Sequence, residues 1–140
     1  MRYAFPARLK KDEADRWIVS FPDVPEALTD GEDRKTVLRE AAEALGSALA
    51  GYVLEKRSIP KPSSLKRGQV LVNVPLLVAG KIALYQAMEE EGVSNVDLAR
   101  RLEISEGAVR RLVNPDHSSR IEKVEAALEA LGKRPVLEAA

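Results

Sequence analysis

Hydrophobic and polar positions follow one pattern in the first half of the chain and another after residue 75. In the first half, 3–9 and 16–21 mix aliphatic and aromatic side chains with polar ones, and the charged run 10–15 lies between them. Two short strands joined in this way predict a β-hairpin. Pro22 and Pro25 fix backbone angles and remove amide donors, so we expect 21–29 to be an irregular segment or an edge strand, followed by a turn at Asp30 and Gly31.

A long amphipathic helix is predicted over 33–56, because apolar residues recur there every three or four positions. Gly46 and Gly51 lie inside it, and each costs about 1 kcal/mol relative to alanine, so its later turns are expected to be irregular or closely packed. The Pro- and Ser-rich stretch 59–68 is expected to be extended or a loop, and 70–74 a further strand. The order strand, strand, short strand, helix, strand indicates an α+β fold in which the helix covers one face of a small sheet.

From Pro75 onward the pattern is helical. Helices are predicted over 75–91, from Ser94 or Asn95 to Leu102, over 105–113 and over 118–131, with serine or asparagine at several of the starts to cap free amides. The sequence therefore predicts two domains, a mixed one over 1–74 and an all-α one over 75–140. The tail 135–137 is expected to be a short strand or a frayed end.

Residues 95–113, NVDLARRLEISEGAVRRLV, fit a helix-turn-helix. Leucine, isoleucine and valine side chains, Ile104 among them, would hold the two helices together, and Ala99 supplies the small residue where the helices touch. The turn position that often carries glycine is Glu103, where the backbone tends toward a positive φ. The same apolar spacings also occur in small helical domains of other function, and paired arginines are often only a solvated surface.

If this motif binds DNA, the helix that begins after Ser105 enters the major groove and its first turns reach base edges. Arginine can pair with guanine there, and a carboxylate can accept from cytosine. The preceding helix would cross the phosphate backbone. The candidate base contacts are Ser105, Glu106, Arg110 and Arg111, and the candidate phosphate contacts are Ser94, Asn95, Arg101, Arg120 and Lys123.

Composition limits how such binding could work. The chain has 22 basic and 22 acidic side chains, and 75–140 has 9 basic against 11 acidic, so DNA affinity would depend on where single arginines lie and on two copies binding together. The absence of cysteine excludes disulfides, thiol nucleophiles and thiolate metal sites. No apolar run approaches the ~20 residues of a membrane helix, and 1–17 lack the apolar part of a signal peptide. We therefore expect a cytoplasmic protein with no membrane partner.

Four segments together resemble the HicB antitoxin family, in the subgroup that ends in a helix-turn-helix of Xre/Cro type. The resemblance extends over nearly the whole chain, and the segments read RWIVSFPDVPEALTDGED, IPKPS, VPLLVAGKIALYQAM and DLARRLEISEGAVRRLVNPDHSSRIEKVEAALEALGK. The pairing of FPDVPEALTDG with a downstream helix-turn-helix is more specific than either part alone. The resemblance implies a partial RNase H-like βββαβ domain without nuclease activity in 1–74, followed by an all-α helix-turn-helix domain in 75–140.

The resemblance also implies partners. The first domain would bind and neutralise a HicA-type toxin, a ribonuclease that cleaves mRNA. The second would bind operator DNA and repress the operon, with the chain assembled as a homodimer or a dimer of dimers. Toxin-binding residues would lie in an exposed loop around Asp23, Val24 and Glu26, and on the strand 17–20, with Trp17 and Val19.

Catalysis and cofactors are not expected. The acidic residues of the first half lie mostly in predicted turns, without a fixed spacing on one strand or helix that would build a catalytic pair. His117 lies in a loop without partners for a metal, and the chain has no glycine-rich phosphate loop. Two other hypotheses stay open: a regulator whose N-terminal domain senses a small ligand in a deep pocket, and a metal-dependent hydrolase fused to a DNA anchor.

Overall fold

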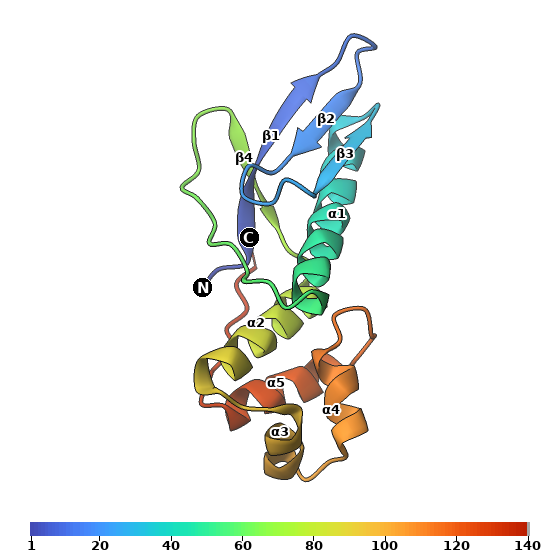
Figure 1. Cartoon of the computed structure of the whole chain (residues 1–140). Helices are drawn as coiled ribbons and strands as arrows, with labels where there is room; N and C mark the ends of the chain where they lie inside the picture. The colour runs from blue at the N-terminus through green and yellow to red at the C-terminus, as the bar shows by residue number, and fades with distance from the viewer. Residues whose placement is uncertain (140) are drawn as a thin grey trace. The chain divides into compact units, whose positions relative to one another are not determined.

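The computed structural model describes residues 1–139, and its contacts divide the chain into two compact units, Met1–Pro75 and Leu76–Ala140. Unit 1 contains β1 (Ala4–Lys11), β2 (Trp17–Ser20), β3 (Leu28–Gly31), α1 (Arg34–Leu54) and β4 (Gln69–Asn73) (Figure 1). Unit 2 contains α2 (Leu76–Glu91), α3 (Asn95–Leu102), α4 (Glu106–Val113) and α5 (Ile121–Ala130). The predicted α+β class, an antiparallel sheet followed by helices, is confirmed. Within residues 1–139 no helix combines the length and the apolar character needed to cross a membrane.

The sheet of unit 1 has the strand order β3-β2-β1-β4, and each neighbouring pair is antiparallel. One face is packed against α1, which contacts β2, β3 and β4 (Figure 1). Phe5 lies opposite Val72 on this face and is fully buried. Strand residues alternate between faces, so Leu28 and Leu71 lie on the other face, where they are 62% and 53% exposed. The sheet therefore has one buried face and one face, called the open face below, that leaves Leu28 and Leu71 exposed although Pro6 on it is buried.

The helix α1 buries the apolar residues that the sequence pattern predicted for it. Asp33 caps it by accepting a hydrogen bond from the Thr36 amide at 3.0 Å. The helix is continuous from Arg34 to Leu54, so of the two alternatives for its later turns the irregular one is wrong, while the burial of Gly46 agrees with close packing. Tertiary packing of the apolar face outweighs the low helix propensity of two glycines. The buried side chains on that face are Val37, Ala41, Leu45, Leu49, Tyr52 and Val53.

The turn expected at Asp30 and Gly31 is wrong, because both residues belong to β3, where they pair with Ile18 and Trp17. β3 lies at the edge of the sheet, so residues of low strand propensity are tolerated there. Gly31 also lies close to α1, since a Cβ atom at this position would lie 3.2 Å from Cβ of Val37, a tight contact. Glycine thus marks a close approach between strand and helix at this position.

Unit 2 is built around one apolar core, to which all four of its helices contribute. The core side chains include Leu84, Leu98, Val109, Val124 and Leu128. α5 begins at Ile121 and not at residue 118 as expected, and residues 133–139 form no helix or strand. The reason for the late start of α5 lies in the hydrogen bonds of Ser119, described below.

Candidate nucleic-acid interface

The turn between α3 and α4 is formed by residues 103–105. Glu103 has φ 56° and ψ 42°, so the predicted positive φ at the usual glycine position is confirmed. Its amide and that of Ile104 donate to carbonyl groups at the end of α3, which satisfies acceptors that the helix leaves free. A non-glycine residue in this conformation costs about 1 kcal/mol, and the turn is retained despite that cost.

The two helices around this turn are held by their apolar faces. Leu98 and Val109 are fully buried, while Leu112 and Ala99 are nearly so. Ile104, which we expected to help join the helices, is 39% exposed and lines a groove instead. Ile104 follows the left-handed Glu103 in the turn and lies outside both helices.

The outer surface of α4 carries the predicted base-contact residues. Ser105 caps the helix by accepting from the Ala108 amide at 3.1 Å. Glu106 lies in the first turn, where its charge complements the helix dipole, and its Oε1 accepts from Nη1 of Arg110 at 3.1 Å. Both side chains of this ion pair are half exposed or more. Arg110 is therefore present on the surface already paired with a carboxylate of its own helix.

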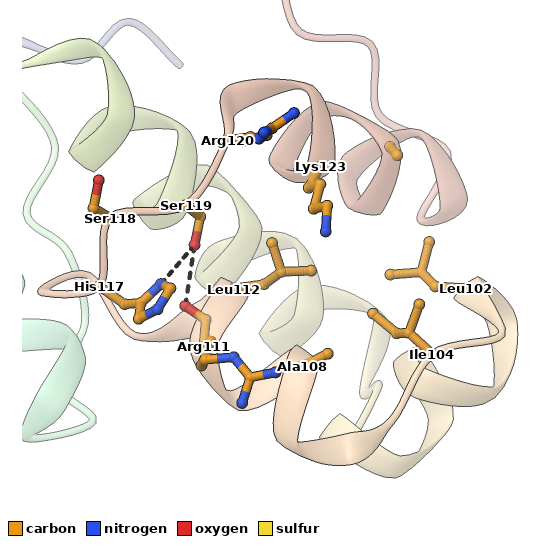
Figure 2. Close-up of a pocket in the computed structure, with 11 residues that line it drawn as sticks. Leu102, Ile104, Ala108, Arg111, Leu112, His117, Ser118, Ser119, Arg120 and Lys123 are labelled. Carbon is orange, nitrogen blue, oxygen red and sulfur yellow. Dashed lines mark hydrogen bonds between the residues drawn. The ribbon is translucent and has the colours of Figure 1, made fainter.

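A groove of about 370 Å³ runs between the end of α3, one side of α4 and the start of α5. Figure 2 shows Arg111 on its α4 side and Arg120 and Lys123 on its α5 side. Within residues 1–139, these three cations form no ion pair. The apolar floor between them consists of Leu102, Ile104, Ala108, Leu112 and Ala126. Three unneutralised cations around one groove make a site suited to an anion such as a phosphate group.

The predicted phosphate contacts on α3 lie at its start and on its surface. Ser94 and Asp97 form a capping box, in which the Ser94 hydroxyl accepts from the Asp97 amide and Asp97 accepts from the Ser94 amide. The backbone hydrogen bond from Ser94 is the main cause that lowers the pKa of Asp97. Asn95 is half-buried as the first residue of the helix, and Arg101 is exposed. The structure thus places these residues on α3, apart from the groove-lining set.

In unit 1, the loop around Val24 differs from the exposed loop that the sequence predicted. Val19 and Val24 are both 0% exposed, so the expectation that Val24 lies on an exposed loop is wrong, and neither valine is available to a partner. Two successive turns, closed by the bonds Val24 N to Phe21 O and Ala27 N to Val24 O, point every third side chain inward. Phe21, Val24 and Ala27 are all buried for this reason.

The two acidic residues of that loop are engaged within unit 1. Asp23 accepts a hydrogen bond from the Ser63 amide at 2.8 Å and a second from the Ser63 hydroxyl. Glu26 accepts from the Tyr52 hydroxyl at 2.7 Å and from Arg57 at 2.9 Å. The bond from Tyr52 is the largest of the causes that lower the pKa of Glu26. Both carboxylates therefore fasten the loop to the end of α1 and to the segment that follows it.

Trp17 is the remaining candidate in unit 1. It is half-buried at the start of β2, and the ammonium of Lys11 lies 5.0 Å from the centre of its ring. This distance is within the range of a cation–π interaction. Trp17 thus keeps some accessible surface, unlike Val19 on the same strand.

Sequence reasoning overlooked Lys81. It occupies a position of the apolar stripe of α2, four residues after Leu77 and three before Leu84, and it is fully buried. A charged residue at such a position is the signal that could have identified it. Its ammonium bonds to Ser119, which is why Ser119 does not cap α5 and the helix starts at Ile121.

Metal binding receives no support from the described part of the chain. Among residues 1–139, no three His, Asp or Glu side chains gather where they could hold a metal ion. His117 instead lies with its Nδ1 3.1 Å from the Ser119 hydroxyl (Figure 2).

Comparison with known proteins gives consistent results. A family model described as HicB_like antitoxin of bacterial toxin-antitoxin system matches residues 4–83. Antitoxin HicB 2 of Photorhabdus laumondii is 41% identical over 133 residues, which are 95% of this chain and 92% of that protein. Antitoxin HicB of Escherichia coli K12 is 37% identical over 133 residues, covering 95% of each chain. Antitoxin HicB of Pseudomonas fluorescens is 33% identical over 136 residues, or 96% of this chain and 92% of its own.

Proposed function

Since the chain belongs to the HicB-like family of antitoxins of bacterial toxin–antitoxin systems, we propose that it neutralises a HicA-type toxin and represses its own operon by binding operator DNA. The family is a regulatory one, and the chain is an antitoxin and not an enzyme. A toxin that cleaves mRNA and an operator on DNA would both be met in the cytoplasm, where we place the protein.

Unit 1 is the part that we assign to the toxin. Its partial RNase H-like fold would act by covering the toxin's RNA-binding face, without chemistry of its own. The open face of the sheet supports this assignment, because Leu28 and Leu71 are large apolar side chains left exposed there. Of the contacts first expected, Trp17 keeps accessible surface, whereas Asp23 and Glu26 would take part only by giving up the bonds that they make within unit 1.

Unit 2 is the part that we assign to DNA, with α3 and α4 acting as a helix-turn-helix. The observation that carries this proposal is the groove beside α4, whose cations Arg111, Arg120 and Lys123 have no carboxylate partner within residues 1–139. α4 would lie in the major groove and α3 across the backbone, with phosphates near the start of α5. Base contacts would come from Ser105, Glu106, Arg110 and Arg111, and phosphate contacts from Ser94, Asn95, Arg101, Arg120 and Lys123.

Dimerisation is part of this proposal. Residues 75–140 carry two more acidic than basic side chains, so a single copy has no general attraction to DNA. Two copies would place two α4 helices in half-sites about one helical turn, ~34 Å, apart. A homodimer or a dimer of dimers would thus gain affinity from two specific contacts made together.

The proposal is tested with the wild-type chain. Co-expression with the small toxin encoded beside it should restore growth, and the purified protein should shift DNA from upstream of the operon but not unrelated DNA of equal length. Continued toxicity in the presence of folded antitoxin would exclude the toxin assignment. Equal binding to both DNA fragments would exclude a specific operator.

Arg110→Ala should weaken operator binding by about 1–3 kcal/mol, roughly 5- to 150-fold in Kd, because a bidentate contact to guanine is lost. The fold should not change, since Arg110 is exposed. A gel-shift titration against the operator measures the loss. Arg134→Ala, which removes the same charge from the exposed segment after α5, serves as the matched control and should bind as wild type does. Equal affinity of Arg110→Ala and this control would remove Arg110 from the base-contact set.

A further inference from the structure

Lys81 on α2 is a buried cation with three hydrogen bonds. Its side chain is 0% exposed, and its Nζ donates to the carbonyl oxygen of Arg111 at 2.9 Å, to that of Asn114 at 2.8 Å and to the Ser119 hydroxyl at 2.8 Å. A lysine ammonium has three N–H groups, so each of them is used. The first two acceptors lie at the C-terminal end of α4, where helix carbonyls lack partners and the helix dipole is negative.

The position is costly for a charged group. The three partners of Lys81 are uncharged, and burial lowers the pKa of its ammonium. A leucine or methionine would continue the apolar stripe of α2 at this point without the cost of removing a charge from water. What lysine provides, and an apolar side chain does not, is a link between three separate parts of unit 2.

That link fixes the positions of the two sides of the groove relative to each other. Lys81 joins α2 to the end of α4, which carries Arg111, and to Ser119, the residue before Arg120. Figure 2 shows the Ser119 hydroxyl between His117 and the Arg111 backbone, 3.1 Å from His117 Nδ1 and 3.4 Å from the Arg111 oxygen. The connection from α4 to α5 is therefore held at its beginning and near its end by the same ammonium.

The neighbouring residue shows that α2 and α5 are closely packed beside this link. A Cβ atom on Gly80 would lie 3.2 Å from Cγ1 of Val124 and 3.4 Å from Cδ1 of Ile121, both on α5. Loss of the amine would remove the shorter hydrogen bond of each carbonyl group, leaving the Arg111 oxygen with the Ser119 hydroxyl at 3.4 Å and the Asn114 oxygen with the His117 amide at 3.1 Å.

We propose that Lys81 is a positioning residue for operator binding, which holds the end of α4 and the 114–120 segment so that Arg111 reaches the base edges while Arg120 reaches a neighbouring phosphate. Lys81 is buried and does not touch DNA itself. This inference rests on the operator binding proposed above.

The absence of cysteine allows a test that changes only the amine. Lys81→Cys is alkylated in denaturant with 2-bromoethylamine, which rebuilds a lysine analogue, or with 1-bromopropane, which gives a side chain of the same length without nitrogen. Each product is refolded, with wild-type protein taken through the same cycle. Operator affinity is then measured at several salt concentrations, at a temperature where circular dichroism shows each product folded.

The aminoethyl product should bind within about threefold of wild type, and the propyl product at least about tenfold more weakly. The slope of log affinity against log salt should fall by about one in the propyl product as Arg120 loses its phosphate, a change that lower stability alone would not produce. Lys133→Met, which removes a surface lysine paired with Glu90 at 3.0 Å, controls for net charge and should bind as wild type does.

Equal affinity and equal slope for the two alkylated products would overturn the role of Lys81 while leaving operator binding intact. Failure of wild-type protein to bind the operator would instead overturn the operator proposal, and this inference with it. If the propyl product does not refold, Ser119→Ala gives a second test, because it removes one acceptor and keeps the lysine. It should bind about threefold or more weakly, and wild-type affinity of this variant would contradict the proposal.

Discussion

The full-length chain carrying Arg111→Ala, Arg120→Ala and Lys123→Ala should lose operator affinity by about 3 kcal/mol or more, roughly 150-fold in Kd, and still neutralise its toxin. The three side chains surround the groove beside α4 and, within residues 1–139, have no carboxylate partner. Arg120 and Lys123, as phosphate contacts, each contribute counterion release, so the salt slope should fall by about two. A gel-shift titration at several salt concentrations gives the slope, and growth on co-expression with the toxin gives neutralisation.

A charge-matched triple variant, Lys61→Ala, Lys133→Ala and Arg134→Ala, takes the same charge from residues outside the groove. It should keep wild-type operator affinity. An equal loss in both triple variants would mean that net charge and not the groove controls binding. Loss of toxin neutralisation in the groove variant would show that unit 2 also takes part in toxin binding.

Val24→Asp should destabilise unit 1 by on the order of 4 kcal/mol or more and abolish toxin neutralisation, because it puts an unpaired carboxylate into the core. Val24 is 0% exposed between Phe21 and Ala27, which are also buried. Denaturant unfolding followed by circular dichroism measures the loss. The cause of the functional loss is unfolding, not the removal of a contact.

Leu28→Asp is the matched control for this substitution. Leu28 lies four residues later on the open face of the sheet and is 62% exposed, so a carboxylate there remains solvated and stability should change little. If the toxin covers the open face, Leu28→Asp should weaken toxin binding in a folded protein. A stable Val24→Asp variant that only weakens toxin binding would restore Val24 to the contact surface.

Periodicity alone predicted much of this structure. Apolar spacings of three and four identified α1 to α5, and the pairing of short β-rich segments identified the sheet. The left-handed Glu103 was also predicted, because its position in the motif is that of the turn. These features depend on local sequence, which is why the sequence was sufficient to find them.

The errors arise where a distant residue decides the local structure. Gly31 belongs to a strand because it pairs with Trp17 at the edge of the sheet, and α5 starts late because Lys81 holds Ser119. The burial of Val24 was missed because Phe21, Val24 and Ala27 recur every three residues through two successive turns. This period is that of neither a strand nor an α-helix, so pattern analysis does not detect it. Asp23 and Glu26 resembled free surface acids because their partners lie about 26 to 40 residues away.

The ion pair between Glu106 and Arg110 bears on how the antitoxin would search a genome. A chromosome offers about a million or more competing sites, so a regulator must avoid being held by them. In the free chain Arg110 lies 3.1 Å from the Glu106 carboxylate, and on unrelated DNA this pair would remain formed while phosphates repel the acidic side chain. Only a site that offers both a partner for the guanidinium and a donor for Glu106 would compensate for opening the pair. Because an exposed pair one helical turn apart is worth only about 0.3–0.5 kcal/mol, it would weaken binding to unrelated DNA slightly and would not close the recognition surface.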